Sequence, residues 1–359
     1  MFATATLFAK ETVKLGVILP LTGENEAIGQ ECRVGLKILQ DELKAKETAF
    51  DYQFIVEDDQ MLPKQTAMAA QKLLKVDKVD ALFPTYSTGG NVAKPFAEKA
   101  KIPMVAIGAS DPTVANGSYC FTNAAKVDKQ AVMFLETARE LGYKRMAMLS
   151  VIQQGANAIR GAVLKHAKDY GIEIVSDEHF IPGERDFRTL WLRIKETNPD
   201  LIFEQALDPE FGIMLRHKKQ MGLNIPVATV EWFAANNDLA LANGAWQVGS
   251  AWAVSRTGFD KRVSVIDFKI KNFLNAAYTY DSVRIVVNAF EAWAKDHKTG
   301  RPTSRGIAAL IHKLPYDGAL GKSDIDGKGI IDSEVGLWIV GNGELKPIDL
   351  QELKAKLGK

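Results

Sequence analysis

Two loops in the first part of the chain combine hydroxyl groups with glycines directly after apolar runs. They are YSTGG at 86–90, after VDALF, and GAS at 108–110, after PMVAI. Hydroxyls and free amides at a helix start favour an anion, because they donate hydrogen bonds and the helix dipole is positive there. The alternative is that these serines and threonines only cap helices, and position alone leaves both open. The residues concerned are Tyr86, Ser87, Thr88, Gly108, Ala109 and Ser110.

The corresponding loops in the second part of the chain carry acids and aromatics. Asp208 follows the run LIFEQA, and Glu231 follows PVATV with Trp232 beside it. A lone acid at the end of a strand is more often a solvated cap than a ligand-binding group. The two sets of loops together, however, would satisfy a zwitterion. Each charge-assisted hydrogen bond contributes about 1.5–3 kcal/mol, so a few of them support micromolar binding, near −8 kcal/mol.

Short apolar runs alternate with amphipathic stretches from Val13 onward, and this pattern must position the loops. A first series extends to residue 107 and a second one from Lys126 to residue 230. Such alternation predicts parallel sheets with right-handed crossovers, so two series predict an α/β chain with two doubly wound, Rossmann-like lobes. The candidate loops then follow the carboxyl ends of strands, where open sheets bind ligands. Later segments are expected to return to these two sheets: a strand at 249–255, a helix at 276–296 and a hairpin at 334–348.

Length and composition narrow the function classes. The 359 residues suffice for two domains, and the net charge of +1 gives no general attraction to nucleic acid. No apolar window reaches the length of about 18 residues that a membrane-spanning helix needs. Cys32 and Cys120 are too few for a disulfide framework and are expected to be unpaired. Residues 1–11 are interpreted as a signal-peptide remnant or a frayed terminus.

Enzyme signatures are missing from the sequence. No glycine-rich dinucleotide motif follows a strand, and no nucleophile elbow of the form Gly-x-Ser-x-Gly occurs. The five histidines do not have the spacing of metal ligands. The sequence therefore predicts a binding protein without catalysis, metal or cofactor.

Four segments identify a family by resemblance. VKLGVILPLTGENEAIGQECRVGLKI resembles the opening strand, loop and helix of the leucine/isoleucine/valine-binding family, the substrate-binding proteins of ABC importers. HFIPGERDFRTLWLRIKETNPDLIF is similar to the family's second-domain stretch and is the most specific of the four. MLRHKKQMGLNIPV and YTYDSVRIVVNAFEA match its later helices. The likeness extends in order from Val13 to about Ile348.

The resemblance implies a periplasmic monomer that delivers a small molecule to an ABC permease and has no nucleic-acid partner. It implies the type I periplasmic-binding fold, with a ligand in the cleft between two lobes. Three hinge crossings are expected near residues 121, 253 and 333. The N-terminal lobe is predicted to comprise 12–121 plus 254–332, and the C-terminal lobe 122–253 plus 333–359.

The resemblance also assigns roles to individual positions. It places the family's carboxylate-binding serine at Ser87, its paired small residue and hydroxyl at Gly108 and Ser110, and the acid that holds the α-ammonium at Glu231. Two aromatics of the family are missing, since Gly155 occupies one position and Leu207-Asp208 the other. Aromatics elsewhere would compensate; the candidates are Tyr86, Trp232 and Trp252.

These departures leave the ligand's side chain open between aliphatic and aromatic. An aromatic acid or an amide in place of an amino acid is one alternative, and a free-standing sensor with the same fold is another.

Overall fold

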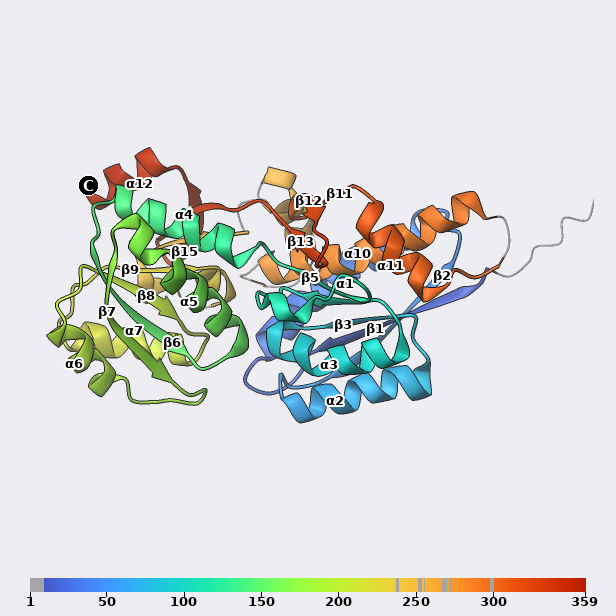
Figure 1. Cartoon of the computed structure of the whole chain (residues 1–359), viewed down its shortest axis with the longest axis horizontal. Helices are drawn as coiled ribbons and strands as arrows, with labels where there is room; N and C mark the ends of the chain where they lie inside the picture. The colour runs from blue at the N-terminus through green and yellow to red at the C-terminus, as the bar shows by residue number, and fades with distance from the viewer. Residues whose placement is uncertain are drawn as a thin grey trace, which may run out of the picture.

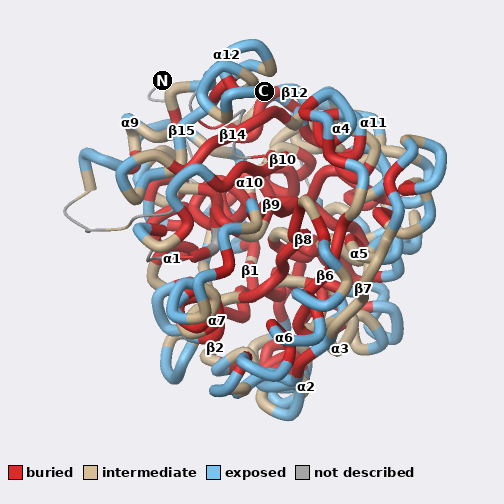
Figure 2. The backbone as a smooth tube through the Cα atoms, turned by 90° about the vertical axis from the view of Figure 1, so that its left-hand side faces the viewer, coloured by how far each residue is buried: buried red, intermediate tan, exposed pale blue. Residues whose placement is uncertain are grey.

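Two α/β lobes lie side by side along the long axis of the molecule (Figure 1). The computed structural model describes residues 10–236, 239–250, 254, 256–266, 270, 273–297 and 300–359. Each lobe has one sheet with helices on both faces, and buried strands form the interior beneath an exposed outer layer (Figure 2). The predicted α/β fold of two doubly wound lobes is confirmed.

The sheet of the first lobe has the strand order β11-β12-β13-β5-β4-β3-β1-β2. Its strands from β13 to β2 pair in parallel, whereas β11, β12 and β13 pair antiparallel at one edge. The strands are β1 (Thr12–Leu19), β2 (Asp51–Asp58), β3 (Ala81–Pro84), β4 (Met104–Ile107), β5 (Cys120–Asn123), β11 (Tyr316–Gly318), β12 (Gly321–Ile325) and β13 (Ile330–Asp332). The helices are α1 (Glu26–Lys44), α2 (Pro63–Lys72), η1 (Leu73–Asp77), α3 (Tyr86–Ala100), η2 (Pro112–Val114), α9 (Phe259–Ser264), α10 (Phe273–Asp296) and α11 (Ser304–Lys313).

The sheet of the second lobe has the order β15-β14-β10-β9-β8-β6-β7, and the hairpin of β14 and β15 forms its antiparallel edge. Its strands are β6 (Arg145–Val151), β7 (Glu173–Phe180), β8 (Leu201–Gln205), β9 (Val227–Val230), β10 (Trp246–Gly249), β14 (Gly336–Gly341) and β15 (Glu344–Ile348). Its helices are α4 (Val127–Glu140), α5 (Gln154–Ala167), η3 (Lys168–Tyr170), α6 (Arg188–Glu196), α7 (Glu210–Gln220), η4 (Trp232–Ala235), η5 (Ala240–Ala242) and α12 (Leu350–Leu357).

The apolar strands form because both faces of each sheet are covered. On β1, Val17 packs into the core beside α1 and α10, whereas the adjacent Ile18 packs into the core on the opposite face, beside α2 and α3. Helices α1 and α10 lie in close contact. Gly35 permits this approach, because a β-carbon there would lie 2.0 Å from the carbonyl oxygen of Ala276.

The described residues place three passages of the chain between the lobes. It leaves the first sheet after β5 and enters the second lobe at α4, and it passes from β13 to β14 between Asp332 and Gly336. Val248 packs in the second lobe's core and Val254 in that of the first, so another passage lies between them. The expected crossing at residue 253 itself falls outside the described residues.

Two local expectations differ from the structure. The helix expected at 91–100 begins at Tyr86, so YSTGG is its first turn and not a turn that precedes it. Gly90 serves close packing, since a β-carbon there would meet Val114 at 2.8 Å. The strand expected at 249–255 is also wrong in position where the structure describes it, because β10 spans Trp246–Gly249 and Val254 is helical. Residues 251–253 and 255 lie outside the described part of the chain. Cys32 and Cys120 are both buried thiols, as expected.

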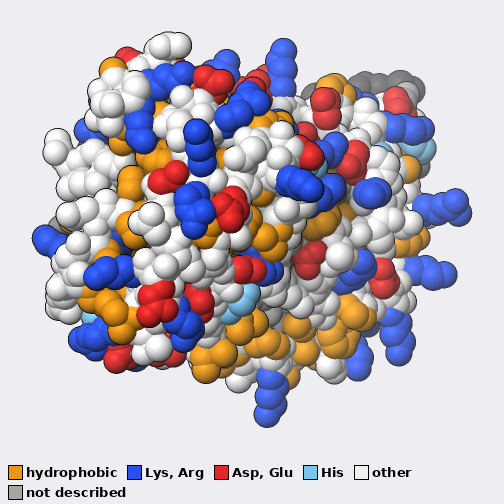
Figure 3. Space-filling view, turned by 60° about the vertical axis from the view of Figure 1, so that its left-hand side comes forward, with side chains coloured by type: hydrophobic (Ala, Val, Ile, Leu, Met, Phe, Trp, Pro, Cys, Tyr) orange, Lys and Arg blue, Asp and Glu red, His pale blue; other side chains and the backbone are white. Residues whose placement is uncertain are grey.

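Charged side chains of both signs are interspersed over the face seen in Figure 3. This distribution matches a formal net charge of +1. Within the described parts of the chain, no helix is both long and apolar enough to cross a bilayer.

Candidate ligand-binding site

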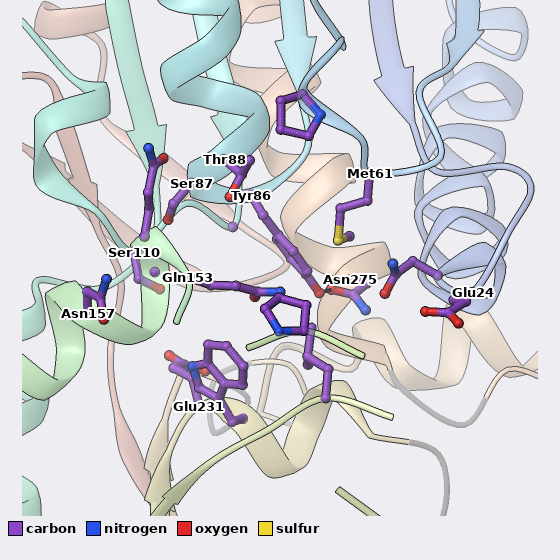
Figure 4. A pocket seen from close by; sticks show the side chains of 18 of the residues that line it. Glu24, Met61, Tyr86, Ser87, Thr88, Ser110, Gln153, Asn157, Glu231 and Asn275 are labelled. Atoms are coloured by element: carbon purple, nitrogen blue, oxygen red, sulfur yellow. Dashed lines mark hydrogen bonds between the residues drawn. The ribbon is translucent and has the colours of Figure 1, made fainter. Parts of the chain in front are cut away.

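A cavity of about 550 Å³ lies between the lobes and is lined by residues of both. Figure 4 shows it from close by, with Ser110 and Asn157 at one end and Met61, Asn275 and Glu24 at the other. Tyr86 and Gln153 lie between the two ends. Cavities of this size hold ligands as large as a typical drug molecule.

The N-terminus of α3 opens onto the first end of the cavity. Thr85 precedes the helix in an extended conformation, and its hydroxyl donates to the carbonyl oxygen of Ile18 (2.9 Å) and so does not cap the helix. Ser87 is buried, and its Oγ accepts a hydrogen bond from the amide of Asp111 (3.0 Å). Because the Ser87 oxygen acts as acceptor toward Asp111, its hydroxyl proton is available for donation into the cavity.

The N-terminus of α5 faces this site from the second lobe. Gln153 precedes α5 in an extended conformation, and its side chain makes no capping hydrogen bond to the first turn of the helix. A β-carbon on Gly155 would lie 3.1 Å from Ser87 Oγ, so the two helix starts are in close contact. Amides at two helix N-termini and the Ser87 hydroxyl converge on one region, which favours an anion.

Glu231 is a buried acid among the residues that line the cavity, at the end of β9 with φ +67°. Its Oε1 accepts hydrogen bonds from the Ser250 amide (2.7 Å), the Ser250 hydroxyl (2.6 Å) and the hydroxyl of Tyr278 (3.4 Å). Its Oε2 is buried and has no hydrogen-bond partner among the residues that the structure describes. Burial raises the pKa of this carboxyl to about 7, against the opposing effect of the Ser250 and Tyr278 hydrogen bonds. Such a group is suited to a cationic ligand.

Aromatic rings form the wall between the two charged regions. The hydroxyl of Tyr86 donates to Asn275 Oδ1 (2.7 Å), and Asn275 Nδ2 donates to Glu31 Oε2 (2.7 Å). Gly108, with φ +62°, lies between the rings: a β-carbon there would be 3.0 Å from Tyr278 and 3.3 Å from Tyr86. Glycine at this position therefore lets both rings reach the cavity.

The lobes touch each other around the cavity. Asn91 Nδ2 of α3 donates to Gln154 Oε1 of α5 (2.9 Å), and Arg185 pairs with Glu24 (3.4 Å). The hydrogen bond from Tyr278 to Glu231 also joins the two lobes. The structure thus has the cleft shut.

Most of the residues expected at the site line this cavity. They are Tyr86, Ser87, Thr88, Gly108, Ser110, Gly155, Glu231 and Trp232. Ala109 packs in the first lobe's core instead. At positions 207–208, Leu207 and not Asp208 is among the described residues that line the cavity. Trp252 lies outside the described residues.

The sequence interpretation missed the contributions of α10 and of the loop after β2. Leu274, Asn275 and Tyr278 line the cavity from the first turns of α10, and Met61 from the β2–α2 loop. The hydroxyls of the segment YTYDS were visible in the sequence, but nothing local to it indicates that this helix start reaches the cleft. Among the described side chains, no group of His, Cys, Asp and Glu is arranged to hold a metal ion.

Comparison with known proteins gives consistent matches along the chain. A family model described as "Periplasmic binding protein" matches residues 12–333. Leu/Ile/Val-binding protein homolog 2 of Brucella abortus is 24% identical over 330 residues, which cover 88% of this chain and 87% of that protein.

Solved structures give the same picture of the fold. A leucine binding protein from Thermotoga maritima superposes with a TM-score of 0.81 at 22% identity, covering 94% of this chain and 98% of that one. A solute binding protein of an ABC transporter from R. palustris, solved with 4-hydroxybenzoate, gives a TM-score of 0.84 at 20% identity and covers 94% and 96%. This chain therefore shares its two-lobed fold with each of these two proteins over nearly its whole length.

Proposed function

Since this chain belongs to the periplasmic binding protein family, whose model matches residues 12–333, we propose that it captures an α-amino acid between its lobes. In this proposal it acts outside the cytoplasm as a monomer, without catalysis, and delivers the ligand to the permease of an ABC importer. The lobes comprise 12–121 plus 254–332 and 122–253 plus 333–359, and the connections between them act as hinges.

The buried Oε2 of Glu231, which has no hydrogen-bond partner in the described structure, carries the proposal. A carboxylate in that position needs a positive partner, because a buried charge without one is costly. An α-ammonium supplies that partner and leaves the α-carboxylate for Ser87, Thr88, Gly108 and Ser110. The amides at the start of α5, near Gly155, complete the clamp on the carboxylate.

A second candidate ligand is an aromatic acid without an amine. Tyr86, Tyr278 and Trp232 give the cavity three aromatic walls, and the R. palustris relative of similar fold was solved with 4-hydroxybenzoate. A protonated Glu231 would then donate a hydrogen bond to the ligand instead of pairing with a cation. The two candidates differ in the charge that Glu231 must carry.

A panel of ligands separates the candidates. Native mass spectrometry of the purified protein identifies a retained ligand, and thermal shifts are then measured with amino acids, their carboxamides and aromatic acids. Stabilisation by amino acids, with little by their carboxamides, supports the zwitterion. Equal stabilisation by carboxamides refutes the carboxylate site at Ser87, and stabilisation by aromatic acids alone refutes the role given to Glu231.

Closure of the lobes is tested separately. Small-angle scattering should show a smaller radius of gyration with the stabilising ligand than without it, because ligand contacts from both lobes exist only in the shut form. An unchanged radius at saturation would contradict capture by closure. A sensor that uses the same fold would give the same result, so transport itself requires uptake measurements with the permease.

A further inference from the structure

A chain of hydrogen bonds leads from Glu231 to the connections between the lobes. Ser250 directly follows β10 and donates to Glu231 Oε1 with its amide (2.7 Å) and with its hydroxyl (2.6 Å). Ser333 donates its own hydroxyl to the Ser250 hydroxyl oxygen (3.1 Å). Both serines are fully buried, and neither is among the described residues that line the cavity. Ser333 therefore reaches the ligand-binding acid through Ser250.

Both serines lie where the chain passes between the lobes. Ser250 begins the passage that leads from β10 toward Val254 in the first lobe, and Ser333 lies on the passage from β13 to β14. The two hydroxyls thus join two of the three described passages to Glu231. Connections of this kind absorb the backbone rotations of closure, so a hydrogen bond between two of them depends on how the lobes are arranged.

The remaining passage, from β5 to α4, joins the same network at Asp332. The Lys126 amide donates to Asp332 Oδ1 (3.0 Å), and Lys129 Nζ lies 3.4 Å from Asp332 Oδ2. Lys129 Nζ also donates to the carbonyl oxygen of Ser333 (2.8 Å). Because the Lys129 side chain is exposed, its ion pair adds little stability. Its contact with the Ser333 backbone nevertheless fixes the segment that carries the Ser333 hydroxyl.

The two oxygens of Glu231 have different surroundings. Oε1 accepts from Ser250 and, across the cleft, from the hydroxyl of Tyr278 (3.4 Å). Oε2 has no hydrogen-bond partner among the described residues and is the oxygen left for the ligand's cation. In a buried chain, a hydroxyl that accepts a hydrogen bond becomes a stronger donor. The Ser333 hydroxyl should therefore strengthen the bond from Ser250 to Glu231 and fix the orientation of the carboxyl.

On the basis of the proposed function, we propose that Ser333 is a positioning residue for capture of the ligand's ammonium. Through Ser250 it holds the carboxyl of Glu231 and ties it to the connections about which the lobes rotate. A purely structural serine would stabilise the fold without affecting which ligand binds. The two roles differ in one respect, since the orientation of Glu231 concerns only ligands that carry a cation.

Two matched ligand pairs separate these roles. They are leucine with 4-methylpentanoate and phenylalanine with 3-phenylpropanoate, in which the second member lacks only the amine. Ser333→Ala should bind the amino acids about three- to tenfold more weakly, because one hydrogen bond of the chain to Glu231 is lost. The carboxylates should change by less than about twofold. Calorimetry measures the amino acids, and ligand-observed NMR competition measures the weaker carboxylates.

Two further variants make the test specific. Ser333→Thr keeps the hydroxyl and should restore the native ratio of the two affinities in each pair. Thr137→Val is the matched control, because it also deletes one buried hydroxyl of the second lobe, which donates to the Met133 carbonyl oxygen (2.8 Å) within α4. It should bind all four ligands as the native protein does. Melting curves of the ligand-free variants establish that each is folded.

The outcomes distinguish the inference from the proposed function. If Ser333→Ala weakens both members of a pair equally, or neither, Ser333 does not position Glu231 and the inference is wrong, although the amino-acid function stands. If the native protein binds no amino acid at all, the proposed function fails and the inference fails with it.

Discussion

Replacing Glu231 by glutamine removes one charge from the centre of the cavity and little else. The donors on this carboxyl, Ser250 and Tyr278, all approach Oε1, and a glutamine can present its own oxygen to them. The new amide group would take the place of Oε2, which has no hydrogen-bond partner in the described structure. Glu231→Gln should therefore break no internal hydrogen bond.

The expected loss of affinity is large, because the ligand's ammonium would remain buried without its counter-charge. Removing one member of a buried ion pair costs about 3–5 kcal/mol, or roughly two to four orders of magnitude in dissociation constant. Glu231 is 8% exposed, so solvent screens the pair only slightly. Binding that is micromolar in the native protein would then be too weak for calorimetry to detect.

The same substitution should raise the stability of the ligand-free protein at high pH, although it lowers the affinity for the ligand. The pKa of Glu231 is raised to about 7 by burial, above that of an unfolded glutamate, near 4.3. Its contribution is therefore favourable while it is protonated and is lost as the pH rises from about 4.3 through 7. Because glutamine does not titrate, the empty Glu231→Gln protein should melt at the same temperature as the native one at low pH and higher at pH 8.

Titration calorimetry and melting curves at pH 5 and pH 8 measure both effects. Asp208→Asn is the matched control, since Asp208 also follows a strand of the second sheet but is not part of the cavity lining; its affinity should be unchanged. Near-native amino-acid binding by Glu231→Gln would refute the reasoning. It would mean that this carboxyl faces no cation, and the α-ammonium assignment would be lost.

Three further predictions concern the same site. Affinity for an amino acid should fall by up to about tenfold per pH unit below pH 7, because protonated Glu231 must first release its proton; calorimetry in buffers of different ionisation enthalpy measures that release. Ser87→Ala should weaken binding about tenfold or more through loss of one charge-assisted hydrogen bond, with amino-acid titrations as the readout. Gly155→Val should hinder closure, because its side chain would press on Ser87 Oγ, so scattering should show less compaction at saturating ligand while the empty protein melts normally.

Much of the fold was predictable because buried parallel strands leave a strong sequence signal. Runs such as VKLGVIL are apolar throughout since helices cover both faces of the sheet, and β1 is found there. The start of α3 was not predictable in the same way. Serine, threonine and glycine have weak helix propensity, yet close packing of Gly90 on Val114 and Ala106 holds YSTGG in a helical turn. Tertiary contacts outweighed local preference at this position.

The site residues at the ends of strands were predictable, whereas those that reach the site from distant parts of the sequence were not. Ser87 and Glu231 each follow a parallel strand, and the carboxyl ends of such strands mark the binding edge. Asn275, by contrast, contacts Tyr86 across 189 residues of sequence. Its position follows from the return of α10 to the first lobe, which no local pattern encodes. The turn at Gln60 and Met61, which both have positive φ, was equally hidden, because Gln and Met are not among the residues enriched in the left-handed region.

Gly155 shows why the meaning of a residue depends on its partner across the cleft. In the sequence it was a missing aromatic, which suggested only that the pocket had lost a wall. In the structure its small size lets the start of α5 approach Ser87, within 3.1 Å of where a β-carbon would lie. Helix amides then replace a ring beside the proposed carboxylate, so the wall that selects the side chain must lie elsewhere. The rings of Tyr86 and Tyr278, which line the cavity and both approach Gly108, offer such a wall.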